Sequence, residues 1–169
     1  MEDLKFILLL LFLLPGVALG QTVHVEKGKI VYKGKMEVKD PKKEDFYNKA
    51  TKVMLVYVNK EKDSLKIDKE KKEVASKGEL RLPTTYRLIR TLCYTIKLNA
   101  KEDDLKYQID DIYLKERERG GKTKIISSED LLKGMDVSGN EALATEKQLN
   151  QIDMHIQKLL ALMNAEMGK

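Results

Sequence analysis

The sequence contains few of the residue types from which catalytic and metal centres are built. In 169 residues it has one cysteine, two histidines, three prolines and no tryptophan. A single cysteine cannot form an internal disulfide, which excludes a scaffold held together by disulfides. A glycine-rich phosphate loop, Gly-x-Ser-x-Gly, His-Glu-x-x-His and Cys-x-x-Cys are all absent from the sequence. We therefore predict no catalytic set, no metal site and no cofactor.

The histidines and the cysteine are better explained by structure than by chemistry. His24 lies near the start of the chain and His155 lies beside Ile156 in the last predicted helix, so we interpret both as surface imidazoles. Cys93 is in the middle of a predicted strand, on the side opposite the apolar residues. It is either a reactive thiol or a small residue covered by its neighbours. The second interpretation is favoured because no histidine or basic cluster is predicted beside it.

Basic side chains outnumber acidic ones, but their arrangement is not that of a nucleic-acid-binding surface. The chain has 27 lysines and only five arginines, and the lysines are mixed with acids, as in Lys42-Lys43-Glu44-Asp45. Interspersed lysine and glutamate are typical of a solvated face, whereas nucleic-acid surfaces gather charge on one stripe and favour arginine. We predict no nucleic-acid partner. Attraction to anionic lipid headgroups or surface polysaccharide is compatible with the charge.

Residues 1–20 are typical of a signal peptide. Residues 6–14 are all apolar, Pro15-Gly16 end that run, and small residues at Ala18 and Gly20 precede Gln21. A membrane-spanning helix needs about 20 apolar residues, more than this segment supplies. We expect cleavage before Gln21, and export to the periplasm or the cell exterior. An uncleaved anchor is the alternative.

The remaining residues, 21–169, are expected to form a single α+β domain with no transmembrane segment. Removal of residues 1–20 takes away one lysine and two acids, which leaves 31 basic and 25 acidic side chains and a net charge of +6. A chain of this length can bury one hydrophobic core. Because Cys93 is the only cysteine, a lipid anchor at the cleavage site is not expected.

Hydrophobic periodicity predicts the order strand, helix, four strands, helix. The predicted elements are a strand at 29–38, a helix at 41–58, strands at 65–68, 73–81, 86–99 and 105–114, a short helical turn capped by Ser128 and ended by Gly134, and a long helix from Thr145. Each strand has one apolar side, which predicts a five-stranded antiparallel sheet with helices on one face only.

The same segments resemble a family of exported bacterial proteins, the domain-of-unknown-function family 4468, whose fold is similar to that of the TATA-binding protein. The segments that carry the resemblance are Lys43-Glu44-Asp45-Phe46-Tyr47, Ile67-Asp68, Ala75-Ser76-Lys77-Gly78, and the stretches 93–98, 105–113, 128–132 and 149–153. The resemblance implies a curved, TBP-like or helix-grip sheet in the order β-α-β-β-β-β-α. It implies no known activity, and similarity to a DNA-binding fold does not imply DNA binding.

Three surfaces are candidate binding sites. The first is the open face of the sheet, a broad basic and hydroxyl-bearing surface with Lys33, Lys35, Lys77, Arg81, Arg87, Thr91, Thr95, Lys97, Lys106 and Gln108. The second is an apolar cavity under the last helix, lined by Tyr94, Tyr107 and Tyr113. The third is the stripe on the last helix, which could pair with a second copy.

These features favour a non-enzymatic binding or interaction module whose partner is a cell-envelope protein, a glycan or an apolar small ligand. One alternative is a small hydrolase that uses acids of the hairpin, which carries Asp103, Asp104, Asp110 and Asp111. The other alternative is a structural component of a cell-envelope assembly.

Overall fold

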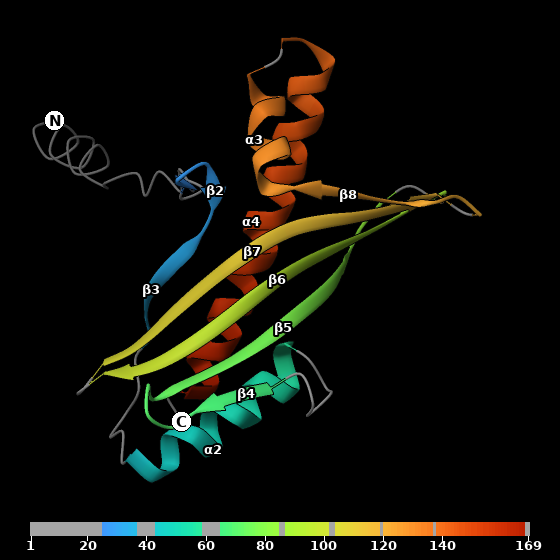
Figure 1. Cartoon of the computed structure of the whole chain (residues 1–169). Coiled ribbons are helices and arrows are strands. Elements are labelled where there is room, and N and C mark those ends of the chain that lie inside the picture. The colour runs from blue at the N-terminus through green and yellow to red at the C-terminus, as the bar shows by residue number, and fades with distance from the viewer. Residues whose placement is uncertain are drawn as a thin grey trace, which may run out of the picture.

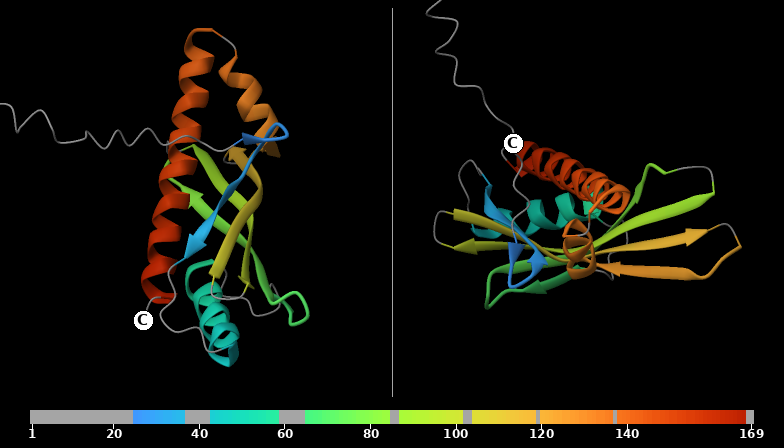
Figure 2. Two further views of the ribbon diagram at one scale, coloured as in Figure 1. Left: turned by 90° about the vertical axis from the view of Figure 1, so that its left-hand side faces the viewer. Right: turned by 90° about the horizontal axis from the view of Figure 1, so that it is seen from above.

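The computed structural model describes residues 25–36, 43–58, 65–84, 87–101, 104–118, 120–136 and 138–167. The predictions for the signal peptide, for His24 and for Asp103 lie outside these residues. Within them the chain forms one curved sheet with helices on one of its faces (Figure 1). The view from above in Figure 2 shows α2 and the long helix α4 on the same side of the strands. This confirms the predicted α+β architecture.

The main sheet has six strands, so the prediction of five was wrong. Its strands are β3 (Tyr32–Met36), β4 (Leu65–Asp68), β5 (Glu73–Leu82), β6 (Leu88–Lys101), β7 (Asp104–Glu118) and β8 (Thr123–Ser127). They lie in the order β3-β7-β6-β5-β4, with β8 paired to β7, and every pairing is antiparallel. A separate two-stranded hairpin joins β1 (Val25–Glu26) to β2 (Lys29–Ile30).

The additional strand is β8, which lies between the last predicted strand and the helical turn that begins near Ser128. Gly120 adopts a φ of 81°, which favours glycine, and Gly121 N–H donates to the Glu118 carbonyl at 2.9 Å. This glycine pair is a hairpin turn that returns the chain along β7. As a result β3 and β8 share one edge of β7: β3 pairs with residues 105–109 and β8 with residues 113–117.

Strand β7 contains a bulge that changes which residues face the core. The register shifts between Cys93 and Thr95 of β6, and Asp111 takes a φ of 51° in the left-handed region. A bulge adds one residue to a strand, so each later side chain of that strand points to the opposite face of the sheet from the one that regular alternation predicts. Tyr113, which was expected beside Tyr107 on the apolar side, instead lies opposite Cys93 on the other face.

The predicted helix at 41–58 is an α-helix followed by a π-helix. Helix α2 covers Lys43–Val53 and the π-helical turn η1 covers Met54–Val58. The predicted apolar face is confirmed, since Phe46, Ala50 and Val53 are buried in the core. The wider turn of the π-helix changes the direction in which the side chains after Val53 point, and Tyr57 is half-buried.

The last two helices pack against each other. Helix α3 (Ser128–Met135) is capped by Ser127 rather than Ser128: the Ser127 side chain accepts from Asp130 N–H, and the Asp130 carboxylate accepts from Ser127 N–H. Helix α4 covers Asn140–Met167 and is about 42 Å long at 1.5 Å per residue. It begins before Thr145, whose side chain is buried against Gly134, so the predicted start of the helix at Thr145 was wrong.

The core lies between the inner face of the sheet and α4. The predicted stripe on α4 is confirmed as buried, and it consists of Leu149, Ile152, Ile156, Leu159, Leu160 and Met163. On β6 the alternate residues Leu92, Tyr94 and Ile96 pack against this stripe. Arg90 interrupts the apolar side, as expected, and is paired there with Glu116 at 2.5 Å. None of the helices within the described ranges has both the length and the apolarity required to cross a membrane.

Candidate functional site on the open face of the sheet

The face of the sheet opposite α4 carries the polar half of each alternating strand. On β6, Thr95 and Lys97 lie on this face, while their neighbours Ile96 and Leu98 are fully buried beneath α4. Figure 2 shows α2 and α4 against the other face of the sheet. The open face is therefore available to a partner.

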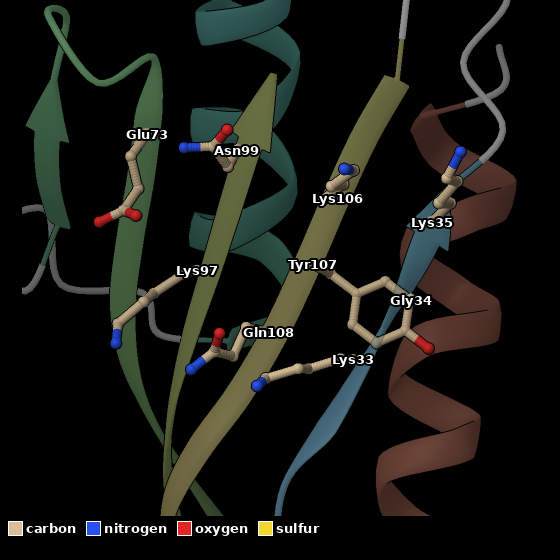
Figure 3. Close-up of a pocket in the computed structure, with 9 residues that line it drawn as sticks. All are labelled: Lys33, Gly34, Lys35, Glu73, Lys97, Asn99, Lys106, Tyr107 and Gln108. Atoms are coloured by element: carbon tan, nitrogen blue, oxygen red, sulfur yellow. The ribbon is translucent and has the colours of Figure 1, made fainter. Parts of the chain in front are cut away.

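Two rows of side chains cross the open face near one end of the sheet. The strand register aligns Lys33 with Gln108 and Lys97 in one row. The second row contains Lys35, Lys106, Asn99 and Glu73. Together they line a hollow of about 470 Å³, which we call the basic hollow, with Lys33, Gly34, Lys35, Glu73, Lys97, Asn99, Lys106, Tyr107 and Gln108 (Figure 3).

Positive charge dominates the basic hollow. Four of its lining residues are lysines, from β3, β6 and β7, and one is an acid, Glu73. Lys33 is paired with Glu26 of β1 at 2.5 Å, and Lys97 is paired with Asp110 at 3.0 Å. Lys106 is exposed and forms no ion pair with any described residue. The hollow is suited to an anionic group.

Lys97 is held in place by its neighbours on β7. Its ammonium and the Gln108 amide both donate to the same oxygen of Asp110, at 3.0 Å and 2.6 Å. The hydrogen bond to Asp110 raises the pKa of Lys97, so its charge is retained at neutral pH. Asp111 accepts a hydrogen bond from the Thr95 hydroxyl at 3.2 Å. Two of the four acids of the hydrolase alternative, Asp110 and Asp111, are thus engaged by neighbouring donors.

Asn99 adds a polar group to the wall of the hollow, and Gly34 allows a close approach of β3 to Tyr107. The Asn99 amide donates to the Lys71 carbonyl at 2.9 Å, and its buried Oδ1 has no hydrogen-bond partner in the described part of the chain. The ring of Tyr107 lies against Gly34, where a Cβ atom would be 2.6–2.8 Å from the ring (Figure 3). Glycine at position 34 therefore gives this ring space to lie across β3 on the inner face of the sheet, on the side of the buried Leu105 and Ile109.

The structure brings together only part of the predicted surface. Lys33, Lys35, Lys97, Lys106 and Gln108 line the hollow, and the remaining residues lie elsewhere. Lys77 pairs with Thr95 and Arg81 with Thr91 farther along the strands, and Arg87 is exposed just before β6. Sequence reasoning missed Glu73, Asn99, Tyr107 and Gly34. The first two could have been found, since they share the outward side of β5 and β6 with Lys77 and Lys97.

Cys93 lies in a separate cluster on the open face. The thiol is 2% exposed, which confirms the interpretation of a covered residue. It lies 3.8 Å from Glu79, which also accepts from Lys115 at 2.6 Å, and Tyr113 is opposite it on β7. Burial, and then the negative charge of Glu79, raise the pKa of the thiol. A thiol with a raised pKa is a weak nucleophile at neutral pH.

The predicted cavity under the last helix exists only in part. A groove of about 230 Å³ lies between α4, η1 and the strands β5 and β6, and Tyr94 lines it. Tyr107 packs against the core near β3, away from this groove, and Tyr113 is on the open face because of the bulge. His155 is not a surface imidazole: it lies in this groove, and its Nε2 atom is buried.

Comparison with solved structures places the fold. A TBP-like protein from Parabacteroides distasonis ATCC 8503 matches with a TM-score of 0.69 and 15% identity over 86% of this chain and 96% of that chain. The fold is TBP-like. A DUF4468 family protein from Bacteroides ovatus ATCC 8483 matches with a TM-score of 0.55 and 14% identity over 84% of this chain and 90% of that chain. These matches support the resemblance drawn from the sequence.

No family model and no curated protein matches the chain. At such low identities the TBP-like fold is what the solved structures have in common with this protein. Its function therefore has to be inferred from its own residues. Within the described residues, no group of three or more His, Cys, Asp or Glu side chains is placed to hold a metal ion. The basic hollow is the polar feature of the TBP-like sheet that is best suited to binding a ligand.

Proposed function

We propose that this protein is an exported binding module that holds an anionic saccharide in the basic hollow of its open sheet face. The observation that carries the proposal is the convergence of four lysines from three strands on a hollow that contains one acid. Lysine ammonium groups bind carboxylate, phosphate or sulfate substituents. The hollow also offers groups that suit the rest of a sugar.

A saccharide is favoured over a simple anion because the hollow has amide groups, from Asn99 and Gln108, besides its lysines. Asn99 Oδ1 lacks a partner among the described residues and can accept from a sugar hydroxyl. A buried acceptor without a partner costs about 1–3 kcal/mol, so a hydroxyl that reaches it contributes to binding.

The proposal is tested by titrating the purified protein with three polymers in low salt. Oligogalacturonate carries carboxylates on sugar rings, maltooligosaccharide is a neutral sugar, and polyglutamate is an anion without sugar. We expect oligogalacturonate to bind tightest, with an affinity that falls as salt screens the lysines. Equal binding of the neutral sugar would contradict the role of charge, and equal binding of polyglutamate would contradict the role of the sugar.

A matched pair of variants locates the binding. Lys106→Gln removes from the hollow an ammonium that has no ion pair among the described residues, and we expect oligogalacturonate to bind about fivefold more weakly, a loss of about 1 kcal/mol. Lys147→Gln makes the same charge change on an exposed position of α4, on the other side of the sheet, and should leave the affinity unchanged. Equal losses in the two variants would show that only net charge matters.

Export belongs to the proposal and rests on the pattern of residues 1–20. Sequencing the N-terminus of the protein recovered from the periplasm or medium is expected to start at Gln21. Recovery of the chain inside the cell with residues 1–20 intact would contradict export.

A further inference from the structure

The groove between α4, η1 and β5 lies on the helix-covered face of the sheet, away from the basic hollow. Its walls are largely apolar, and they include Leu92, Ile156 and Leu159. Two of its apolar residues remain open to solvent, with Leu80 37% exposed and Leu162 42% exposed. These leucines come from β5 and α4, so apolar surface on two different elements faces one space. Such surface gains free energy when a ligand removes it from water.

The depth of the groove depends on the way Tyr94 lies on the sheet. Gly78 is paired with Tyr94 across β5 and β6, and a Cβ atom at position 78 would be 2.3–2.6 Å from the Tyr94 ring. Because Gly78 has no side chain, the ring lies flat over β5 as part of the groove floor. The space above it, about 230 Å³, is smaller than the pockets that hold drug-sized molecules. It suits a single short chain.

One polar atom inside the groove has no partner. His155 Nε2 is buried and forms no hydrogen bond with any described residue. Buried polar atoms are as a rule hydrogen-bonded, so a ligand that reaches Nε2 gains by supplying the missing partner. Lys158 lies one helical turn farther along α4, is exposed, and lines the same groove. An imidazole N–H donor and an ammonium thus lie at one part of an otherwise apolar space.

We infer that this groove binds a medium-chain carboxylate, with its hydrocarbon chain against Leu80, Leu159 and Leu162 and its carboxylate accepting from His155 Nε2 and Lys158. The apolar walls select a hydrocarbon chain and the two donors select an anionic head. The η1 π-helix forms the remaining wall through Tyr57. Single π-helical turns within longer helices are frequent at functional sites.

Decanoate is the probe for this site. Decanol, which has the hydrocarbon chain without the carboxylate, and acetate, which has the carboxylate without the chain, are the controls. At a hundred times its dissociation constant, decanoate is expected to raise Tm by about 5 °C or more, because such occupancy stabilises a domain of this size substantially. Decanol should bind more weakly and acetate should give no shift. A shift from decanol equal to that from decanoate would overturn the proposed head group, and no shift with decanoate would overturn the site.

Two exposed residues of α4 supply a matched pair of variants. Leu162→Gln places a polar group in the groove and should weaken decanoate binding at least fivefold. Met154→Gln makes the same kind of change at a 54% exposed position outside the groove and should leave binding unchanged. Equal effects of the two variants would overturn the site.

His155→Phe keeps a ring at this position and removes the donor. It should reduce the affinity for decanoate to that for decanol, and an unchanged preference for decanoate would overturn the role of His155. Lys106→Gln in the basic hollow should not affect decanoate, whereas a loss there would place decanoate on the open face and overturn this inference. If the groove does not bind decanoate, the proposal that the hollow binds a saccharide is unaffected, so the two proposals are tested separately.

Discussion

At the scale of single residues, the lysines of the basic hollow differ in how readily they meet a ligand. Lys97 already donates to Asp110 and Lys33 to Glu26, so an incoming anion must compete with a carboxylate for each. Lys106 has no such competitor in the described part of the chain and is exposed. An anionic ligand therefore has to displace no described carboxylate at Lys106. For this reason the Lys106→Gln variant is the most informative one.

Cys93 provides a prediction about pH. Its pKa is raised by burial and by the charge of Glu79, so the thiolate appears only when the solution is more alkaline than an ordinary cysteine requires. Glu79→Gln removes the negative charge and releases Lys115 from its ion pair. Both changes favour the thiolate, and the alkylation rate of Cys93 by iodoacetamide should therefore reach half its maximum at a lower pH.

The matched control is Glu73→Gln, on the same face of β5 but opposite Asn99 instead of Cys93. It should leave the alkylation profile unchanged. A profile that does not move in Glu79→Gln would show that burial alone sets the reactivity of the thiol.

At the scale of the elements, the bulge of β7 organises the open face. The extra residue at Asp111 turns Tyr113 and Lys115 outward beside Cys93, and keeps Ile112 and Leu114 in the core. Without the bulge, a strand that begins with Leu105 and Ile109 inward would direct Tyr113 into the core as well. The Cys93 cluster therefore depends on one residue with a left-handed backbone.

This dependence predicts the effect of substitutions at Asp111. Asp111→Gly and Asp111→Val both remove the hydrogen bond from Thr95, but only valine is strained at a φ of 51°. Asp111→Val should therefore be less stable than Asp111→Gly by about 1–2 kcal/mol. Urea denaturation of the two variants measures this difference, and equal stabilities would show that the bulge relaxes at no cost.

Element positions could be predicted from the sequence where apolar residues recur at a regular spacing. The strand at 65–68 and the buried stripe of α4 are confirmed for this reason. The strand β8, the π-helical turn and the bulge were missed, because each depends on tertiary pairing rather than on local pattern. The start of α4 was missed because Thr145 and Gln148 have the spacing of a capping box, a pattern typical of the first turn of a helix. In the structure Thr145 is a buried residue within the helix, which begins at Asn140.

At the scale of the whole molecule, the TBP-like sheet has two chemically different faces. The helix-covered face contains the core and a small apolar groove, and the open face contains the basic hollow. Alternation along each strand predicted which lysines lie on the open face. It could not predict the hollow, because that depends on how β3 pairs with the first half of β7, two segments far apart in the sequence.

The most direct test of the proposed function is an NMR titration of the isotope-labelled protein with oligogalacturonate. The largest backbone amide shifts are expected around the basic hollow, at Lys33, Lys97, Lys106 and Gln108, and they should disappear in high salt. Amides on the outer side of α4, such as Asn150 and Met154, should not shift. Shifts centred on α4, or no shifts at all with a ligand in excess, would contradict the assignment of the open face as the binding surface.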